Sequence, residues 1–384
     1  MIASAAIIAS TFAQNAQGFF LDEAAAKTGA VCLDGTPGAY YLSPGSGDGA
    51  SKWYIHHQGK CVDARSHSLS LPRCWFTRSF LTSHVFVRSD LSGGGWCRSP
   101  VDCLGRSVST LGSSKDYPKT ETDSQMAGQS GAMSRDAQKN PMMFTWNHVH
   151  IRYCDGNSFT GNNASSTHVT DPSHRFNDST LYWRGSLILD AVIDSLIDNP
   201  IAQLNKAAEV VVGGGSAGGL ATIIHCDRWA DRIASMNAGT KYACLADSGF
   251  FLDHEGPPKP PRFPLYGYHT GMKWAYQQQN SSVGVQKDCY AAHAKTGDAW
   301  MCNFAQHTAS FNKAPLFARQ SMYDSVRPPS RASSRAASAL APPARCGVAA
   351  PRLHRCARPR ANGFFSLTSL SLSLSLSLSR FDYI

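Results

Sequence analysis

The sequence predicts an α/β fold in which helices flank a mostly parallel central sheet, and two observations support this prediction. Short runs rich in β-branched and aromatic residues alternate along the chain with segments whose apolar residues recur at helical spacing. Glycine clusters at residues 93–95 and 213–215 punctuate these runs, as tight turns between strands and helices do. A chain of 384 residues, 42% of them hydrophobic, can bury the core of one large domain of this kind.

The elements of this fold follow in order along the chain. The predicted strands, which are short and bounded by turn residues, are 51–57, 149–153, 209–212 and 316–318. Residues 186–197 are a predicted helix, because their apolar side chains return every three or four positions. The β-branched run 210–212, the glycines 213–215 and the helical pattern 217–229 predict a strand, a tight turn and a helix in succession. We assign residues 21–325 to this domain.

The first residues are apolar and uncharged. Residues 1–13 contain no Lys or Arg, and Thr11, Phe12 and Ala13 form an acceptable small-residue cleavage site. We therefore expect residues 1–20 to hold a secretory signal peptide, with a buried N-terminal helix or a truncated signal as the alternatives. No apolar run of about 20 residues occurs, so no transmembrane helix and no membrane partner are expected.

Residues 326–384 form a low-complexity tail. Residues 327–362 are rich in Arg, Ala and Pro without an acidic residue, and alternating Leu and Ser dominate residues 366–379. Such a composition cannot form a packed core, so we expect the tail to be disordered. A translated dinucleotide repeat explains the alternation better than a strand does. We interpret the tail as a shifted reading frame or a mispredicted gene end, with a genuine low-complexity extension as the alternative.

Charge and cysteine content limit the class of partner. The formal net charge is +9, but the chain beyond Asp324 holds nine Arg and one acidic residue, so the rest has a net charge of only +1. A nearly neutral domain argues against nucleic acid as a partner. The 12 Cys include no CxxC pair, which disfavours a metal site and favours an oxidising compartment. Sequons at Asn163, Asn177 and Asn280 agree with a secreted glycoprotein.

Residues 214–218 fit the pattern G-x-S-x-G, with Ser216 at its centre. The preceding β-branched run and the following helical pattern are the context that a nucleophile elbow requires. In such an elbow, glycines let strand and helix approach closely, and the serine hydroxyl projects at a helix N-terminus that favours a developing oxyanion. The alternative is a phosphate-binding loop, but the Lys-Ser/Thr pair of a P-loop is absent. Ser216 is therefore the candidate nucleophile.

A second glycine cluster, residues 93–95, can supply the other half of an acyl-transfer site. Such a site needs at least two backbone N–H donors about 3 Å from the oxyanion. One donor comes from the residue after the nucleophile, Ala217, and the others usually come from a glycine-rich loop after an earlier strand. Gly95 and Trp96 are the candidates in this chain, and an ordinary flexible loop is the alternative.

Nine segments, in this order, resemble the plant pectin acetylesterase family, to which the Notum-like carboxylesterases are more distantly similar. The segments are Gly-Gly-Gly-Trp-Cys (93–97), Asp-Cys-Leu (102–104), Leu-Gly-Ser-Ser (111–114), Trp-Asn (146–147), Arg-Tyr-Cys-Asp-Gly-Asn-Ser-Phe (152–159), Tyr-Trp-Arg-Gly (182–185), Gly-Ser-Ala-Gly-Gly (215–219), Ala-Asp-Ser-Gly-Phe-Phe (246–251) and Tyr-Asp-Ser (323–325). The resemblance covers residues 30–325 and implies an α/β-hydrolase-like fold.

The resemblance also implies an activity and its residues. Ser216 would be the nucleophile, Gly95, Trp96 and Ala217 the oxyanion hole, and Asp324 the acid of the triad. The implied function is a serine carboxylesterase that hydrolyses O-acetyl esters of pectin in the plant cell wall. Neither a metal nor a cofactor is expected, and we expect a secreted monomer.

Three departures from the family pattern affect these expectations. Gly215 stands where the family usually has Cys before the nucleophile. Residues 59–92, which lack helical or strand periodicity, separate the strand at 51–57 from the glycine loop; deleting them restores the family spacing, so we interpret them as a surface insertion that arose from a retained intron. The family's catalytic His region is replaced by the tail, where His354 is the only His and its surroundings do not match.

The missing histidine leaves the catalytic base unidentified. We therefore expect little or no esterase activity from the chain as written. Two alternative functions stay open: a hydrolase-like relic that is non-catalytic or only binds, and a Notum-like esterase that removes a fatty-acyl group from its substrate.

The sequence also predicts roles for several other residues. Asp247, Asp253 and His254 follow an apolar stretch and could be mistaken for members of the triad. The resemblance places residues 246–251 in a loop on the substrate side, and Asp324 suits the chain order Ser, Asp, His better. His225 is expected to be packed or exposed on the helix after Ser216. Cys97 and Cys103 are candidates to pair across a short loop. The tryptophans expected in the core rather than on a carbohydrate platform are Trp146, Trp183 and Trp229.

Overall fold

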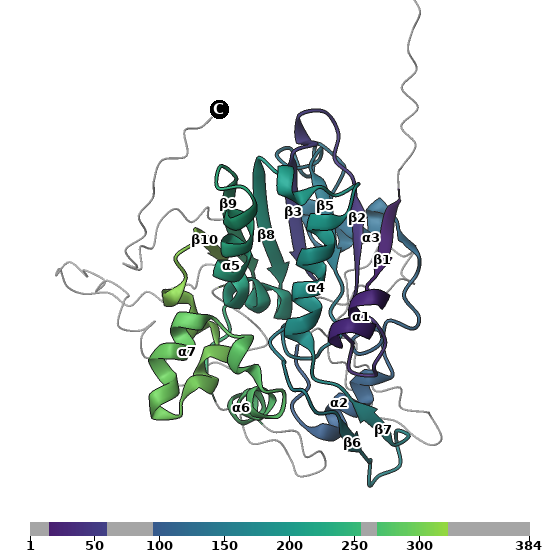
Figure 1. Cartoon of the computed structure of the whole chain (residues 1–384), viewed down its shortest axis with the longest axis vertical. Helices are drawn as coiled ribbons and strands as arrows, with labels where there is room; N and C mark the ends of the chain where they lie inside the picture. Colours follow the sequence, from purple (N-terminus) through teal and green to yellow (C-terminus); the bar gives the residue numbers. More distant parts are fainter. Residues whose placement is uncertain (1–14, 60–94, 255–266, 322–384) are drawn as a thin grey trace, which may run out of the picture. The chain divides into compact units, whose positions relative to one another are not determined.

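An eight-stranded sheet forms the centre of the part of the chain that the structure describes, residues 15–59, 95–254 and 267–321 of a computed structural model (Figure 1). Its strands lie in the order β10-β9-β8-β3-β5-β2-β1-β4, and β6 and β7 form a separate hairpin. The strands are β1 (Ala16–Phe20), β2 (Ala39–Ser43), β3 (Lys52–His57), β4 (Thr120–Glu121), β5 (Asn147–Ile151), β6 (Thr167–Val169), β7 (Ser179–Leu181), β8 (Glu209–Gly215), β9 (Lys241–Asp247) and β10 (Leu316–Arg319).

Five neighbouring strands, β5, β3, β8, β9 and β10, run parallel to one another. The pairs β5–β2, β2–β1 and β1–β4 are antiparallel and complete the sheet. The predicted mostly parallel sheet is therefore confirmed. The carboxyl ends of β3, β8 and β9 meet at one edge, because His57 pairs with Gly214 and Gly215 pairs with Asp247. Open α/β sheets bind their ligands at this edge.

Helices flank the sheet, and Figure 1 shows α4 and α5 side by side across one face. Ion pairs of Arg228 with Asp190 and of Arg232 with Asp194 join these two helices. The α-helices are α1 (Asp22–Thr28), α2 (Pro100–Ser107), α3 (Asp123–Gln129), α4 (Gly185–Asp198), α5 (Ala217–Met236), α6 (Tyr268–Gln278), α7 (Lys287–His293) and α8 (Ala305–Thr308).

The main core forms where α4 and α5 bury their apolar side chains together with those of the parallel strands. Its fully buried members include Val212 of β8, Ile188 of α4 and Leu220 of α5. The three tryptophans predicted for the core, Trp146, Trp183 and Trp229, are at most 8% exposed, so that prediction is confirmed.

The predicted elements are confirmed with shifted ends. β3 and β10 agree with prediction to within one residue at each end, α4 is one residue longer at each end, and β5 begins and ends two residues early. The prediction of a turn at residues 213–215 is wrong. Those glycines are the last three residues of β8, since each pairs with β9 and the first two also pair with β3. The turn is confined to the single residue between β8 and α5.

The domain begins before residue 21, the boundary predicted from the sequence. Residues 16–20 form β1, which pairs with β2 along four residues and with β4 along two. Ala16 is fully buried and Phe19 stacks on Tyr40 with ring centroids 5.1 Å apart. Residues 16–20, the end of the predicted signal peptide, therefore belong to the sheet. The rest of that predicted peptide, residues 1–14, lies outside the described residues.

Four disulfides join the eight cysteines of the described residues. They are Cys32–Cys154, Cys97–Cys103, Cys226–Cys244 and Cys289–Cys302. The predicted pairing of Cys97 with Cys103 is confirmed. The other four cysteines lie in the predicted insertion and in the tail, outside the described residues.

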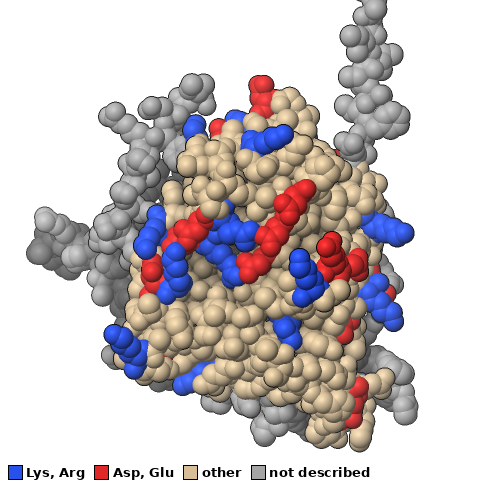
Figure 2. Space-filling model, in the orientation of Figure 1, with Lys and Arg blue, Asp and Glu red and all other residues tan. Residues whose placement is uncertain are grey.

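Positive and negative side chains are interleaved on the face that carries α4 and α5 (Figure 2). Lys287 pairs with Asp231 beside the two ion pairs that join the helices. This face therefore has no continuous patch of one sign, in agreement with the low net charge of the domain. Within the described ranges, no helix is long and apolar enough to span a membrane.

Candidate active site

Ser216 occupies a strained turn between β8 and α5. Its backbone has φ 57° and ψ −121°, a conformation that residues other than glycine rarely adopt. The Ser216 N–H donates to the carbonyl of Asp247 at the end of the neighbouring strand, 3.0 Å away. Such strain costs about 1–3 kcal/mol and concentrates at functional sites. The predicted succession of strand, sharp turn and helix around Ser216 is thus confirmed.

Glycines allow the elbow to pack this closely. A Cβ on Gly214 would lie 2.2 Å from the carbonyl oxygen of Gly218, and a Cβ on Gly218 would lie 2.0 Å from that of His57. Both distances are too short for a side chain, so α5 approaches β8 and β3 only because these positions lack one. Gly215, by contrast, has open space around its Cβ position. The departure from the family's usual Cys at this position therefore leaves room for a side chain.

α5 places its N-terminus at Ser216. Ala217 is its first residue, so the backbone N–H of Ala217 has no partner within the helix. The helix is 20 residues long, and its dipole favours negative charge at this end. The arrangement is therefore able to stabilise an oxyanion that forms beside Ser216.

The glycine loop reaches the elbow through Ser158. The indole N–H of Trp96 donates to the Ser158 hydroxyl, 2.7 Å away, and that hydroxyl donates to the carbonyl of Ala217, 2.9 Å away. Gly95 has φ 66°, and its carbonyl accepts a hydrogen bond of 2.8 Å from the Tyr153 hydroxyl. Hydrogen bonds thus connect all three residues predicted for the oxyanion hole to Ser158. Trp96 and Ala217 bond its hydroxyl directly, and Gly95 is connected through the Tyr153 hydroxyl.

Aromatic side chains surround Trp96 on its other side. Its ring meets Phe251, in the loop after β9, edge to face at 4.8 Å between centroids. It also lies 5.5 Å from Tyr268, the first residue of α6. The loop after β9, predicted to face the substrate, therefore contributes an apolar wall beside the glycine loop.

Comparison with known proteins adds the family. The pectinacetylesterase family model matches residues 10–74 and 61–346. The chain belongs to the pectinacetylesterase family. Pectin acetylesterase 5 of Arabidopsis thaliana is 30% identical over 305 residues, which cover 79% of this chain and 56% of that protein. Pectin acetylesterase 11 of the same plant is 29% identical, with coverage of 80% and 62%.

Notum proteins are similar to this chain at lower identity. Mouse palmitoleoyl-protein carboxylesterase NOTUM is 24% identical over 312 residues, which cover 78% of this chain and 49% of that protein. A crystal structure of the Wnt deacylase Notum from Drosophila matches with a TM-score of 0.59 at 22% identity, covering 86% of this chain and 76% of that one. This structural likeness shows the α/β-hydrolase-like fold. The chain spans about half to three-fifths of the length of its curated relatives.

The acidic residues near the elbow have other partners. Asp247 ends β9 and forms an ion pair with Arg319 of β10 at 2.6 Å. Asp253 lies 2.6 Å from Nδ1 of His269. Asp247 is therefore paired with a cation, whereas Asp253 contacts an imidazole, as the acid of a triad does. Among the described residues, no hydrogen bond joins His269 to Ser216. Asp324, the predicted acid, lies outside the described residues.

The buried histidines behind the elbow also have fixed partners. His57 accepts a hydrogen bond from the Trp229 indole at Nε2, so Nδ1 carries the proton and donates to Thr222, 3.1 Å away. Burial, and then the nearby His225, holds the pKa of His57 well below its usual range. His225 donates to the carbonyl of Ser158 at 2.9 Å, and burial lowers its pKa to about 3. His225 is thus packed rather than exposed.

No described residue forms a hydrogen bond with the Ser216 hydroxyl. The histidine weighed as a base from the sequence, His354, lies outside the described residues. Within the described ranges, no three His, Cys, Asp or Glu side chains gather as metal ligands would.

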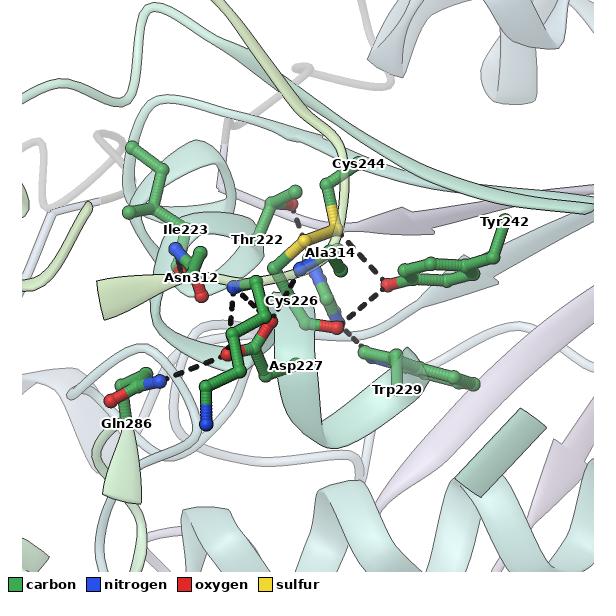
Figure 3. The surroundings of a disulfide bond; sticks show 12 residues. Thr222, Ile223, Cys226, Asp227, Trp229, Tyr242, Cys244, Gln286, Asn312 and Ala314 are labelled. Carbon is green, nitrogen blue, oxygen red and sulfur yellow. Dashed lines mark hydrogen bonds between the residues drawn. A yellow bond between two sulfur atoms is a disulfide. The ribbon is translucent and has the colours of Figure 1, made fainter. Parts of the chain in front are cut away.

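Two contacts beyond the first turns of α5 hold this helix in place (Figure 3). The disulfide between Cys226 and Cys244 joins it to β9, and Asp227 joins it to the segment before β10. The buried Asp227 carboxylate accepts hydrogen bonds from the backbone N–H groups of Lys313 and Ala314 and from the Gln286 side chain, at 2.9–3.1 Å. Residues 313–314 lead into β10, after which the chain continues to Asp324. Asp227 therefore fixes the helix of the elbow relative to the strand that precedes the predicted acid.

Ser158 is the residue of this site that sequence reasoning missed. It lies inside the segment 152–159, which contributed to the family resemblance without a role for any single member. Serine carries no sequence signal for its left-handed backbone (φ 51°) or for contacts with residues about 60 positions away on either side.

Proposed function

We propose that this chain is a serine carboxylesterase that removes O-acetyl groups from pectin, with Ser216 as nucleophile. The supporting observation is the strained Ser216 backbone at the N-terminus of α5, joined to the glycine loop by the hydrogen bonds of Ser158. Gly95, Trp96 and Ala217 form the oxyanion hole, and Asp324 is the triad acid. The protein acts outside the cell, in the plant cell wall.

The reaction has two halves. The Ser216 hydroxyl attacks the acetyl carbonyl after a base has taken its proton, and the backbone N–H groups of the oxyanion hole stabilise the tetrahedral intermediate. The sugar alcohol leaves with a proton returned by the same base. Water then attacks the acetyl-enzyme in the second half, releases acetate and restores Ser216.

Acetyl is the acyl group favoured by the comparisons. The relatives named for pectin acetylesterase activity are about 30% identical to the chain, and those named for palmitoleoyl carboxylesterase activity are 22–26% identical. A Notum-like esterase for a longer acyl group is the second candidate, supported by the likeness to the Notum fold and the apolar wall beside Trp96.

The chain as written has impaired activity because its tail replaces the segment that holds the family's catalytic histidine. Without a base, Ser216 keeps its proton at neutral pH. The loss of this histidine costs a serine hydrolase about 10⁶-fold in turnover and leaves about 10³–10⁴-fold over water. A hydrolase-like protein that is non-catalytic or only binds its ligand is therefore the alternative from another functional class.

The cysteine pattern supports the view that residues 59–92 and 326–384 are additions to a complete domain. Every described cysteine is in a disulfide, and the four others all lie in those two segments. The family match is in two parts, which overlap at residues 61–74 inside the first segment, and its second part ends at residue 346, inside the second segment.

Two of the three sequons suit a secreted glycoprotein. Asn177 and Asn280 are exposed, and the Nδ2 of Asn280 donates to the Asn162 carbonyl only at a long 3.4 Å. Asn163 is half-buried, and its Nδ2, the atom that would carry a glycan, donates to the carbonyl of Gln278 at 2.8 Å. We expect glycans on Asn177 and Asn280 rather than on Asn163.

Acetate release from acetylated pectin tests the proposed function. All 384 residues are expressed beside a repaired variant that lacks residues 59–92 and carries a family-like C-terminus. The repaired variant should release acetate, Ser216→Ala should abolish this, and the unrepaired chain should show little or no turnover.

More than a few per cent of activity in Ser216→Ala would remove Ser216 from the mechanism. Turnover by the unrepaired chain that His354→Ala eliminates would identify His354 as the base. Faster cleavage of a palmitoyl than of an acetyl ester would favour the Notum-like candidate.

A further inference from the structure

Ser158 uses every polar group it has to connect the two halves of the site. Its hydroxyl accepts from the Trp96 indole at 2.7 Å and donates to the Ala217 carbonyl at 2.9 Å. Its N–H donates to the Tyr153 hydroxyl at 3.2 Å, and that hydroxyl donates to the Gly95 carbonyl at 2.8 Å. Its carbonyl accepts from His225 of α5 at 2.9 Å. The side chain is 1% exposed, so water does not supply alternatives.

The backbone of Ser158 is strained, and its surroundings enforce the strain. Ser158 has φ 51° and Phe159 φ 61°, a region that glycine and asparagine occupy more cheaply. The carboxylate of the buried Asp155 holds the turn by accepting the N–H groups of Phe159 and Asn157, at 2.8 and 3.2 Å. The Cys32–Cys154 disulfide anchors the residue before Asp155. A serine at this position adds a hydroxyl that glycine would lack, at the cost of backbone strain.

We infer that Ser158 is a positioning residue that sets the geometry of the oxyanion hole; this inference rests on the proposed function. Oxyanion donors must lie about 2.7–3.1 Å from the developing negative charge. Gly95 has no side chain that could hold this segment, and nothing lies within 4 Å of its Cβ position; the hydrogen bonds of its carbonyl and of the Trp96 indole hold it instead. Ser158 binds the loop at Trp96 and the helix at Ala217 through one hydroxyl, so it fixes the distance between the two sets of donors.

Three variants of the full chain separate this role from a general contribution to stability. Ser158→Ala removes the hydroxyl and keeps the backbone strain, and Ser158→Gly removes the hydroxyl and relieves the strain. Ser281→Ala is the matched control: Ser281 is fully buried and hydrogen-bonds Asn157 and Thr160 in the same layer, but it does not contact Gly95, Trp96 or Ala217.

Hydrogen–deuterium exchange of these full-length variants reads the loop without requiring turnover. Both Ser158 variants should exchange at least about tenfold faster in residues 95–98 and 217–220 than the unsubstituted chain, with β2 and β5 unchanged. Ser281→Ala should not show this local increase. Unchanged exchange at 95–98 in Ser158→Gly would overturn the inference. A uniform increase across the domain would overturn it too, because that result describes a purely structural serine.

Kinetics of the repaired variant give a second readout. Ser158→Gly should lower kcat by about 10- to 100-fold and leave KM within about twofold, since the oxyanion hole acts on the transition state rather than on the bound substrate. An unchanged kcat would contradict the inference while leaving the proposed function intact. If Ser216→Ala has no effect on turnover, the proposed function fails, and the exchange experiment still decides whether Ser158 orders the loop.

Discussion

Gly218, in the first turn of α5, allows the helix of the elbow to touch the central strand β3. A Cβ on Gly218 would lie 2.0 Å from the carbonyl oxygen of His57 and within 2.9 Å of the next backbone carbonyl carbon. Backbone atoms of a central strand cannot rotate away as the end of a side chain can. Gly218→Ala must therefore push α5 from β3, and we expect it to destabilise the domain.

The size of the effect follows from the contact. The helix or the strand must shift by about 1 Å before the Cβ clears the carbonyl, and overpacking of this kind costs about 1–3 kcal/mol or more. The higher helix propensity of alanine stabilises the folded state by about 1 kcal/mol and offsets part of this cost. Because the obstacle is backbone, we expect the upper end of the range, which leaves a net loss of about 2 kcal/mol in the free energy of unfolding.

Gly215→Ala is the matched control, three residues away in the same elbow. Its Cβ would meet nothing within 4 Å, and its φ is not positive. A Gly-to-Ala change at such a position stabilises by about 0.4–1 kcal/mol through the unfolded chain. Urea denaturation followed by tryptophan fluorescence should therefore rank Gly215→Ala at or above the unsubstituted protein and Gly218→Ala well below it. Equal stability of the two variants would refute the close packing of α5 on β3.

Two further predictions concern pH. Burial raises the pKa of Asp155 to about 7, so its contribution to stability is complete below about pH 4 and is lost as the pH rises toward 7. Asp155→Asn does not titrate, and its free energy of unfolding relative to the unsubstituted chain should rise by up to about 4 kcal/mol between pH 4 and 7 in urea titrations; a constant difference would contradict this. Burial, and then the charge of Arg135, lowers the pKa of His148 to about 4, so its contribution is present above about pH 6.5 and is lost as the pH falls toward 4. His148→Gln can still donate to the Met143 carbonyl, and it should reduce the loss of unfolding free energy at acid pH by about 3 kcal/mol. The same change at the exposed His168 should not. Identical profiles of stability against pH for the two variants would exclude His148 as the source.

The sequence predicted four of the five parallel strands, β3, β5, β8 and β10, because each of those segments carries its own local signal; β9 was not predicted. β3 and α4 combine strong apolar periodicity with clear ends, and their predicted bounds are accurate to one residue. β1 was missed because its five residues were included in the predicted signal peptide. Its pairing with β2 and β4, which are distant in sequence, identifies it as a strand.

The glycines 213–215 show how a local rule can mislead at a functional site. Glycine weakens strands, so three in succession predict a turn. In the fold they continue β8, because Gly214 must lie against Gly218 of α5, where a side chain has no space. The requirement for close helix packing therefore outweighs strand propensity, and the turn is compressed into the single residue Ser216.

The residues of the candidate site that lie in a sequence motif could be predicted. A residue that belongs to the site only through tertiary contacts could not. Ser216, Gly95, Trp96 and Ala217 were found from glycine patterns and the family resemblance, and the structure connects them. Ser158 gives no such pattern, because its role depends on contacts with Trp96 and Ala217 that are 62 and 59 residues away. The polar groups of a buried serine are visible only once the strands that surround it are in place.

Strained backbone residues mark the sheet edge that carries the candidate site, independently of any sequence motif. Seven described residues other than glycine have positive φ, and four of them, Ser158, Phe159, Ser216 and Ser248, follow the carboxyl ends of the parallel strands β5, β8 and β9. Strain of this kind persists only where the surroundings over-determine it. Here the surroundings are the glycine contacts of α5 and the hydrogen bonds of Ser158 and Asp155. Since glycine would satisfy the backbone at each serine more cheaply, the strain is consistent with the proposed roles of the two hydroxyls, in which Ser158 orders the oxyanion hole and Ser216 attacks the ester.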